Sequence, residues 1–412
     1  MNKKQDSIFG LAVIVAALGY FVDIYDLLLF SIIRKPSLES IGLHGDQVLE
    51  SGEYIIGIQM AGLLVGGIIW GIMGDKKGRL SVLFGSIVLY SIANIINGFV
   101  QNVNQYALVR FLAGVGLAGE LGAGITLVSE LLPKEKRGIG TSIVAGIGIT
   151  GAVVAYFISS HFDWRICYFI GGGLGLLLLL LRVSVMESNM FHKVKQLPVS
   201  KGNFFMFFTN ADRFKRYLLS ILIGLPTWYI IGVLISFCDK FGTEFGITDT
   251  IKPGKAVMYS YAAISIGDIA IGLISQWLKS RKKALYIFYG ITSIFMLLYF
   301  LQKGGSASQM YILCAGLGFG AGFWAIFVTM GAEQFGTNLR ATAATTIPNM
   351  VRGALPLIII LFKWIRGMTD YVTGGWVIGI IIMTISTVAV IMTKETFGKD
   401  LNYLEEDVAP AK

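Results

Sequence analysis

The sequence predicts an all-α membrane protein of twelve transmembrane helices, arranged as two six-helix bundles related by pseudo-symmetry. Of its 412 residues, 55% are hydrophobic and only 14% are charged, whereas soluble domains carry about 25% charged residues. Apolar stretches of about 20 residues, the length that crosses a hydrocarbon core, recur along the chain. The third observation is an internal repeat of about half the chain.

Twelve apolar segments are long enough to form these spans. The first stretch, Ile8–Ile33, is too long for the apolar region of a cleavable signal peptide and lacks a small-residue cleavage site, so it is interpreted as the first span. The predicted spans are 8–33, 52–74, 80–100, 105–130, 138–160, 165–186, 216–238, 256–278, 284–302, 308–332, 341–363 and 372–393.

Most lysines and arginines fall in loops on the side of both termini. The positive-inside rule therefore places both termini in the cytoplasm, with the chain a multi-pass protein of the inner (cytoplasmic) membrane. These loops account for the net charge of +9 without a nucleic-acid partner. The expected surroundings are the lipid bilayer, and the expected state is a monomer.

The longest connection, Glu187–Lys215, divides the chain into two halves. It separates a bundle over 1–186 from one over 216–393, which is followed by a cytoplasmic tail over 394–412. The connection is basic and contains the run "NFFMFF". An amphipathic helix on the cytoplasmic leaflet would explain both features. The alternative is a polar linker whose phenylalanines begin the seventh span.

The two halves resemble each other in sequence. "SELLPKEKRGIGTS" follows the fourth span and "AEQFGTNLRATAAT" follows the tenth. Glu333 lies 203 positions after Glu130, and Arg340 lies 203 positions after Arg137. Upstream, "AGVGLAGE" corresponds to "AGLGFGAG". This repetition indicates an internal duplication.

The stretch "GIMGDKKGRL" places four charges and two glycines between two apolar spans. Gly74 and Gly78 permit a tight turn. Asp75 can accept hydrogen bonds from backbone N–H groups at a neighbouring helix start or pair with an arginine. We expect a charge cluster that opens and closes as a gate; the alternative is a tight, positively charged loop alone. The expected clusters are Arg79, Glu130 and Arg137, mirrored by Glu333, Arg340 and either Arg281 or Lys282.

This loop resembles the cytoplasmic signature of the major facilitator superfamily, which implies the major facilitator fold. The repeated Glu/Arg pairs and the C-terminal "ETFGKDL" resemble the sugar-porter-like branch. "GYFVDIYDLLLF" and "RFLAGVGLAGELGAG" resemble the span-one and span-four signatures of the metabolite:proton symporter family. The second-half copy of the loop lacks the Asp and both glycines.

The resemblance carries over to individual residues, which are Asp23, Tyr25, Asp26, Arg110 and Glu120. Two positions depart from the symporter pattern. An aspartate stands at 23 where glutamate is usual, and a leucine stands at 121 where an aromatic residue is usual. The resemblance implies a class of substrate, metabolites that are carboxylates or zwitterions, and no single compound.

Ionisable side chains inside spans are functional candidates because burying them in a membrane is costly. Asp23 and Asp26 share one face of span one. Together with Arg110 and Glu120 of span four, they are the predicted proton-coupling groups. The alternative for Asp26 and Arg110 is a permanent ion pair between helices.

Arg352 is the predicted substrate ligand, because Pro348 and Pro356 loosen its span and a guanidinium binds a carboxylate in a bidentate manner. Asp268 either contacts the substrate or pairs with a lysine in the cytoplasmic half. The resemblance implies that spans one, four, seven and ten line the cavity. The remaining predicted substrate-binding residues are Asn349, Tyr25, Trp228 and Trp324.

The three cysteines give no disulfide or metal framework, and the three histidines lie in loops or at span ends. No cofactor and no enzymatic nucleophile–base pair is expected. The predicted function is secondary active transport, namely proton symport that takes up a small carboxylate-bearing or zwitterionic metabolite by alternating access. The alternatives are a proton-antiporting exporter of a metabolite, siderophore or drug, and a non-transporting membrane sensor.

Overall fold

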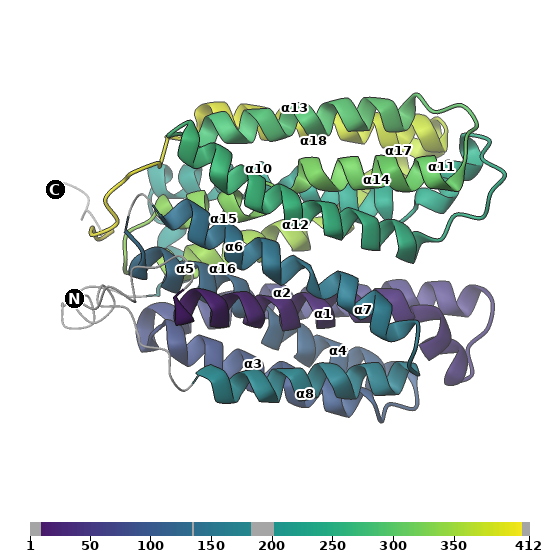
Figure 1. Cartoon of the computed structure of the whole chain (residues 1–412), viewed down its shortest axis with the longest axis horizontal. Coiled ribbons are helices and arrows are strands. Elements are labelled where there is room, and N and C mark those ends of the chain that lie inside the picture. The colour runs from purple at the N-terminus through teal and green to yellow at the C-terminus, as the bar shows by residue number, and fades with distance from the viewer. Residues whose placement is uncertain (1–9, 134–135, 183–201, 406–412) are drawn as a thin grey trace.

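In the computed structural model, which describes residues 10–133, 136–182 and 202–405, two helical bundles lie side by side. Figure 1 shows the first half, in purple to teal, below the second half, in green to yellow. Twelve helical segments are long and apolar enough to cross a membrane, which confirms the predicted number of spans. The start of the first span and the segment after the last lie at the same end of the molecule, called here the terminal end.

The first bundle holds spans one to six. Its helices are α1 (Leu11–Ser40), α2 (Asp46–Lys77), α3 (Arg79–Asn97), α4 (Val103–Leu117) with α5 (Glu120–Leu131), α6 (Arg137–Ile149) with α7 (Gly151–Ser159), and α8 (Trp164–Arg182).

The second bundle holds spans seven to twelve. Its elements are the short turn η1 (Phe204–Phe207), α10 (Ala211–Tyr229) with the π-helical η2 (Ile230–Ile235), α11 (Cys238–Glu244), α12 (Pro253–Trp277), α13 (Arg281–Phe300), α14 (Ala307–Ala321) with α15 (Trp324–Glu333), α16 (Arg340–Gly353) with α17 (Leu355–Met368), and α18 (Tyr371–Met392).

Several spans are interrupted at equivalent places in the two halves. Span four breaks at Gly119, and span ten breaks 203 positions later at Gly322. Span five breaks at Thr150, and span eleven breaks at Ala354. Pro356 explains the last break, because its ring clashes with the carbonyl four residues upstream and it donates no hydrogen bond. The breaks free backbone groups near the middle of the membrane, where a ligand can use them.

Span seven changes its winding without breaking. Pro226 lies in the last turn of α10, and the π-helical segment η2 begins four residues later. A proline removes one hydrogen bond from the helical ladder, and an extra residue inserted per turn is a common response. The wider turn presents side chains of this span to the space between the bundles.

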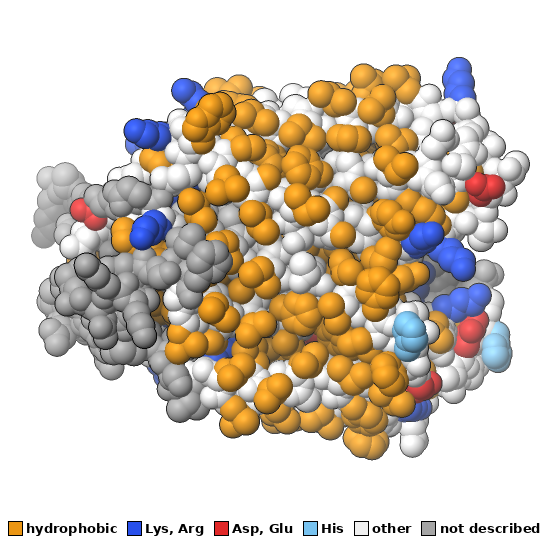
Figure 2. Space-filling model, in the orientation of Figure 1, with side chains coloured by type: hydrophobic (Ala, Val, Ile, Leu, Met, Phe, Trp, Pro, Cys, Tyr) orange, Lys and Arg blue, Asp and Glu red, His pale blue; other side chains and the backbone are white. Residues whose placement is uncertain are grey.

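The outer surface is apolar around the middle of the molecule. In Figure 2, hydrophobic side chains cover the centre of this face, while charged side chains and histidines lie toward its two ends. Large hydrophobic residues such as Leu180, Trp277 and Leu357 are more than half exposed. A belt of this kind matches the hydrocarbon core of a bilayer, so the chain is a multi-pass membrane protein.

Only part of the connection between the bundles is described. The amphipathic helix predicted over this connection falls mainly on residues 183–201, which lie outside the described residues. The aromatic run forms η1, and the seventh span begins after it at Ala211, where Asn210 caps the helix. Phe207 is buried and stacks on Tyr217 with ring centroids 4.4 Å apart. These phenylalanines therefore precede the seventh span rather than begin it.

Glycines let helices α2 and α4 approach closely. A Cβ atom at Gly114 would collide with the backbone carbonyl of Gln59 and lie 3.2 Å from the backbone nitrogen of Leu63. A backbone cannot rotate away as a side chain can. At Gly57, by contrast, a Cβ atom would have no neighbour within 4 Å.

We therefore expect Gly114→Ala to destabilise the protein by about 1–3 kcal/mol, the usual cost of overpacking a core. Gly57→Ala, on α2, is the matched control and should unfold at the wild-type temperature. The measurement is thermal unfolding of both variants in the same detergent. Equal unfolding temperatures would show that the contact between α2 and α4 tolerates a methyl group.

Candidate functional site

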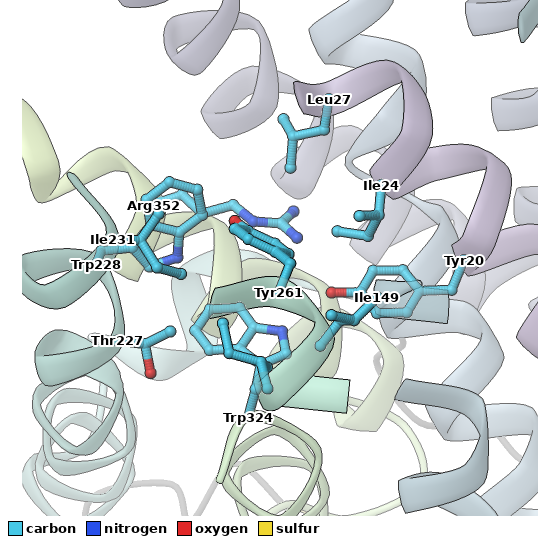
Figure 3. Close-up of a pocket in the computed structure, with 11 residues that line it drawn as sticks. Tyr20, Ile24, Leu27, Ile149, Thr227, Trp228, Ile231, Tyr261, Trp324 and Arg352 are labelled. Carbon is cyan, nitrogen blue, oxygen red and sulfur yellow. The ribbon is translucent and has the colours of Figure 1, made fainter. Parts of the chain in front are cut away.

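A cavity of about 320 Å³, including the part open to solvent, lies between the two bundles. Both halves contribute to its wall, and Figure 3 shows the side chains that face it. The lining residues are Tyr20, Ile24 and Leu27 of α1, Ile149 of α6, Thr227 and Trp228 of α10, Ile231 of η2, Tyr261 and Ile264 of α12, Trp324 of α15 and Arg352 of α16.

Of the described residues in this wall, only Arg352 is charged. It is 2% exposed, and its Nη1 donates to Oδ1 of Asn349 at 3.0 Å. The guanidinium carbon lies 5.8 Å from the ring centroid of Trp324. Within the described parts of the chain, its Nε has no hydrogen-bond partner and no carboxylate lies within ion-pair distance. A buried cation with unused donors can bind an anionic ligand.

The rest of the wall is mainly aromatic. Figure 3 shows Tyr20, Tyr261 and Trp324 around the space that the Arg352 guanidinium enters. The indole N–H groups of Trp228 and Trp324 have no acceptor among the residues described. Aromatic faces and unused N–H donors beside a cation favour a planar ligand that carries an anionic group.

The predicted substrate residues divide into two groups. Trp228, Trp324 and Arg352 line the cavity, as expected. Asn349 lies behind Arg352: it accepts from the guanidinium, and its Nδ2 donates to the carbonyl of Ala118 across the bundle interface at 3.1 Å. Asn349 therefore holds the guanidinium in place and ties it to the break in span four.

Tyr25 and Asp268 do not line the cavity, which corrects their predicted position. The hydroxyl of Tyr25 donates to the carbonyl of Cys167 at 2.9 Å, inside the first bundle. Tyr20 occupies the cavity instead, because five residues turn a helix by about 140°. Asp268 accepts from the backbone N–H of Ala325 at 2.9 Å, so it caps α15 next to the cavity and pairs with no lysine among the residues described.

Asp26 and Arg110 form a buried ion pair between α1 and α4. Nη1 of Arg110 lies 2.8 Å from Oδ1 of Asp26, and Nη2 donates to the Asp26 backbone carbonyl at 3.1 Å. Gln59 and Asn94 accept further hydrogen bonds from the same guanidinium at 3.4 Å. This geometry matches the alternative interpretation of Asp26 and Arg110, which is an ion pair between two helices.

Glu120 pairs with an arginine that sequence reasoning missed. Arg182, at the end of α8, donates to both carboxylate oxygens of Glu120, at 2.9 and 2.5 Å. Ser86 donates to the same carboxylate at 2.7 Å. Arg182 stands at the end of an apolar stretch, where an arginine usually reaches the membrane surface, so its full burial cannot be predicted from the sequence.

Asp23 differs from the other predicted proton-coupling residues. It is fully buried on α1, and both of its carboxylate oxygens have no hydrogen-bond partner within the described chain. It lies within electrostatic range of Arg352, Glu120, Asp26 and Arg182, without a direct contact to either arginine. Asp23 therefore belongs neither to the described cavity wall nor to the ion pairs of the first bundle.

The loop between α2 and α3 joins the two bundles at the terminal end. Oδ1 of Asp75 accepts from the backbone N–H of Ala341 at 3.1 Å, and Oδ2 accepts from that of Thr342 at 2.9 Å. This confirms the expected contact with a neighbouring helix start, here the first turn of α16. Gly78 has a φ of +105°, which glycine adopts without strain, so the tight turn requires it. A Cβ at Gly74 would lie 2.9 Å from that of Ala341, so glycine also permits the close approach.

The first predicted charge cluster includes an arginine from the second half of the chain. Glu130 pairs with Arg79 of its own half at 2.8 Å and with Arg340 of the other half at 3.1 Å. Arg137, expected beside Glu130, instead donates to the backbone carbonyls of Leu132 and of Lys399 in the tail, at 3.3 and 3.4 Å. Glu333 of the second half is within electrostatic range of Arg137.

Arg281, rather than Lys282, completes the second cluster. Its Nη2 lies 3.0 Å from Oε1 of Glu333, whereas Lys282 is directed to the carbonyl of Ile391. Glu395, in the tail, accepts from the Ser280 hydroxyl and from the N–H groups of Arg281 and Lys282. Burial alone would raise the pKa of Glu395, but these hydrogen bonds outweigh it and hold the pKa below its ordinary value.

These features define a class of protein. Two pseudo-symmetric bundles, a cavity between them at the level of the helix breaks, and ionic contacts between the bundles at one end are the parts of a membrane transporter. Residues 7–360 match the model of the Major Facilitator Superfamily, and the chain belongs to this family.

Two relatives illustrate what similar chains transport. The niacin transporter NiaP of Acinetobacter baylyi is 26% identical over 426 residues, which cover 94% of each chain. The gentisate transporter of Corynebacterium glutamicum is 22% identical over 81% of this chain and 76% of its own length. The relatives are transporters of organic acids and not enzymes.

Solved structures share the fold. The proton:xylose symporter XylE, bound to 6-bromo-6-deoxy-D-glucose, superimposes with a TM-score of 0.73 at 17% identity, over 96% of this chain and 98% of its own. FucP in the outward conformation gives a TM-score of 0.73 at 12% identity, over 92% and 97%. At these identities the likeness concerns the fold alone.

The contact of Asp75 with α16 gives a prediction about closure of the terminal end. A carboxylate at a helix start contributes about 1 kcal/mol, so Asp75→Asn should raise the open population roughly fivefold. Ser142→Cys is a suitable reporter, because Ser142 is buried where α6 meets α12. We expect maleimide to label it several-fold faster in the Asp75→Asn background.

The matched control is Lys76→Gln, which changes an exposed residue of the same loop. It should leave the labelling rate of Ser142→Cys unchanged. The three native cysteines are buried, and their labelling is subtracted with the protein that lacks the reporter. Unchanged labelling in Asp75→Asn would mean that this contact does not hold the end closed.

Proposed function

We propose that this protein takes up a small planar aromatic carboxylate together with protons, by alternating access. The observation that carries the proposal is Arg352, a buried cation with unused donors, in a cavity walled by Tyr20, Tyr261, Trp228 and Trp324. Among the described residues, no acidic side chain lines this cavity. An anion is therefore favoured over a cation as its ligand.

The chemistry of an aromatic carboxylate fits these groups one by one. A carboxylate binds a guanidinium through two parallel hydrogen bonds. A flat ring attached to it can stack on an indole or phenol face. Niacin and gentisate, which the relatives transport by name, are aromatic carboxylates.

Proton coupling is assigned in this proposal to Asp23. Asp26 and Glu120 each have an arginine partner, whereas Asp23 has none in direct contact within the described chain. A buried carboxyl group without a cation costs least when it is neutral. Arg352 is the cation that stabilises ionised Asp23 at longer range. When a substrate carboxylate engages Arg352, that stabilisation is lost and Asp23 gains a proton, so substrate and proton favour each other's binding.

The proposed direction of transport rests on the charge of the loops and on the contacts that close the terminal end. The excess of Lys and Arg in the loops of the terminal end favours the cytoplasm on that side and the inner membrane of a bacterial cell. The contacts of Asp75 and Glu130 close that end. In this state the cavity is placed to load from the opposite side, which is the outside, and opening of the gate releases the substrate inward.

The test is uptake of labelled nicotinate or benzoate into proteoliposomes. An inward proton gradient should drive accumulation above the external concentration, and a protonophore should abolish it. A xylose or proline probe should not accumulate. Accumulation that ignores the proton gradient would reject the coupling, and failure of all aromatic carboxylates to move would reject the substrate class.

Arg352→Lys should weaken binding of nicotinate about tenfold or more, because an ammonium cannot reproduce the planar two-point contact. Nicotinamide, which lacks the carboxylate, should bind neither protein. The measurement is ligand-induced thermal stabilisation of the purified proteins. Arg366→Lys, at the end of α17, is the matched control and should retain full stabilisation. Equal stabilisation of wild type by nicotinate and nicotinamide would remove Arg352 from the binding site.

Asp23→Asn should abolish proton-driven accumulation of nicotinate while keeping substrate exchange, since the neutral amide mimics the protonated acid. Exchange is measured by counterflow in the same liposomes without a proton gradient, which serves as the control for folding. Uphill accumulation at the wild-type level would exclude Asp23 and return the role to Glu120 or Asp26.

A further inference from the structure

We infer that protons reach the coupling carboxylates through a polar seam inside the first bundle, separate from the substrate cavity. The inference rests on the proposed proton coupling and adds a route to it. The polar seam is defined by the residues of α3 that face the interior of the first bundle, which are Ser86, Tyr90, Ser91, Asn94 and Asn97.

The seam connects the two ion pairs of the bundle. At one end, the Ser86 hydroxyl donates to Glu120 at 2.7 Å. Toward the other end, Asn94 accepts from Arg110 and lies beside Asp26. The distance along α3 from Ser86 to Asn97 is roughly 16 Å at 1.5 Å per residue. The seam therefore covers about half the thickness of the hydrocarbon core.

Most seam residues carry polar atoms that the protein does not satisfy. The Tyr90 hydroxyl, the Ser91 hydroxyl and both side-chain amide atoms of Asn97 are buried without a hydrogen-bond partner within the described chain. The same is true of both oxygens of Asp23. Buried polar groups are nearly always hydrogen-bonded, either to protein or to ordered water. Consecutive groups of this kind along one helix face are suited to a chain of bound water.

Asp23 and Tyr90 lie where the seam meets the coupling site. Tyr90 is within electrostatic range of Glu120, Arg182, Asp23 and Asp26. On α1, Tyr20, Ile24 and Leu27 face the cavity, whereas Asp23 is turned about 60° from that stripe. Asp23 thus lies beside the cavity-facing stripe of α1 and is not part of it.

The repeated half of the chain supplies an internal comparison. Arg79 and Arg281 hold equivalent ion pairs, 202 positions apart, so helix α13 is the counterpart of α3. At the positions of Ser86 and Asn94, α13 carries Phe288 and Met296. The fold therefore builds a bundle of this shape without a polar seam.

The remaining counterparts on α13 are largely satisfied by the protein. Ser293, which corresponds to Ser91, donates to the carbonyl of Tyr289 at 2.8 Å. Tyr299, which corresponds to Asn97, donates to the carbonyl of Leu234 at 2.9 Å. Thr292, the counterpart of Tyr90, is the exception with an unpartnered hydroxyl. A single such group does not make a path, whereas several in succession do.

The transfer is a sequence of exchanges in which one O–H bond forms as another breaks. A water or hydroxyl in the seam accepts a proton on its oxygen and releases its own to the next oxygen, ending at a carboxylate oxygen of Asp23. One proton enters and one carboxylate is neutralised, with no oxidation and no co-reactant. The hydroxyls of Tyr90 and Ser91 hold the water in line and take part in this exchange.

The test removes these two hydroxyls in a Tyr90→Phe/Ser91→Ala variant. Neither hydroxyl has a protein partner among the residues described, so the fold should be retained and the thermal unfolding temperature should match wild type. Proton entry is followed with a pH-sensitive dye inside proteoliposomes, and nicotinate counterflow is measured in parallel. We expect proton-coupled uptake at least about tenfold slower, which corresponds to about 1.4 kcal/mol in the barrier, with counterflow unchanged.

The matched control is Ser293→Ala on α13, which removes the counterpart hydroxyl and should leave both rates unchanged. The single variants Tyr90→Phe and Ser91→Ala each keep one hydroxyl and should show intermediate proton rates. Wild-type proton entry in the double variant overturns the seam while leaving proton coupling intact. Equal loss of counterflow assigns the hydroxyls to folding or substrate binding and also overturns it. If the wild-type protein transports nicotinate without protons, the proposed proton coupling itself is overturned.

Discussion

A charged side chain inside a membrane protein has to be met by an opposite charge, a helix end or a ligand, because hydrocarbon offers no water. Here Asp26 is met by Arg110, Glu120 by Arg182, and Asp75 by the start of α16. Each of these contacts joins two helices that are distant in sequence. The positions of the helices in both bundles thus depend on where the buried charges find partners.

Asp268, which has no counter-charge among the residues described, caps the start of α15. Asp23 and Arg352 are buried charges that also lack a counter-charge in direct contact within the described chain. They lie on opposite bundles, within electrostatic range of each other, at the level of the cavity. A fixed ion pair would resist any change, whereas two incompletely satisfied charges respond to a proton or an anionic ligand. In the proposed mechanism, this pair responds to the proton and the ligand, while the other buried charges hold helices together.

The duplication explains the ionic contacts at the terminal end and fails to explain the cavity. Both halves keep a glutamate and an arginine at these positions, and the ion pair of Arg340 with Glu130 joins one bundle to the other. The buried charges have diverged: four of them lie in spans one and four, and Arg182 joins them in the described first half. The second half contributes Arg352 and most of the aromatic wall. The described first half thus holds most of the buried charges within the spans, and the second half supplies most of the cavity wall.

Sequence alone was sufficient for the fold class, for the number of spans and for the tight turn at Gly78, because these follow from local hydropathy, length and backbone freedom. It also identified Arg352, Trp228 and Trp324 as cavity residues, since a cation and aromatic side chains inside spans are conspicuous. It placed Tyr25 in the cavity in error, because the rotation of α1 about its own axis is set by packing.

Only the tertiary structure decided which charges are neutralised. Arg182 is hidden at the end of an apolar stretch, yet it supplies the partner of Glu120 from another helix. The ion pair of Arg340 with Glu130 and the polar face of α3 likewise depend on how helices far apart in sequence are brought together. Hydropathy along a chain indicates which residues are buried. The partner of each buried charge depends on how the helices pack, because electrostatic energy depends on distances in space and not on positions in sequence.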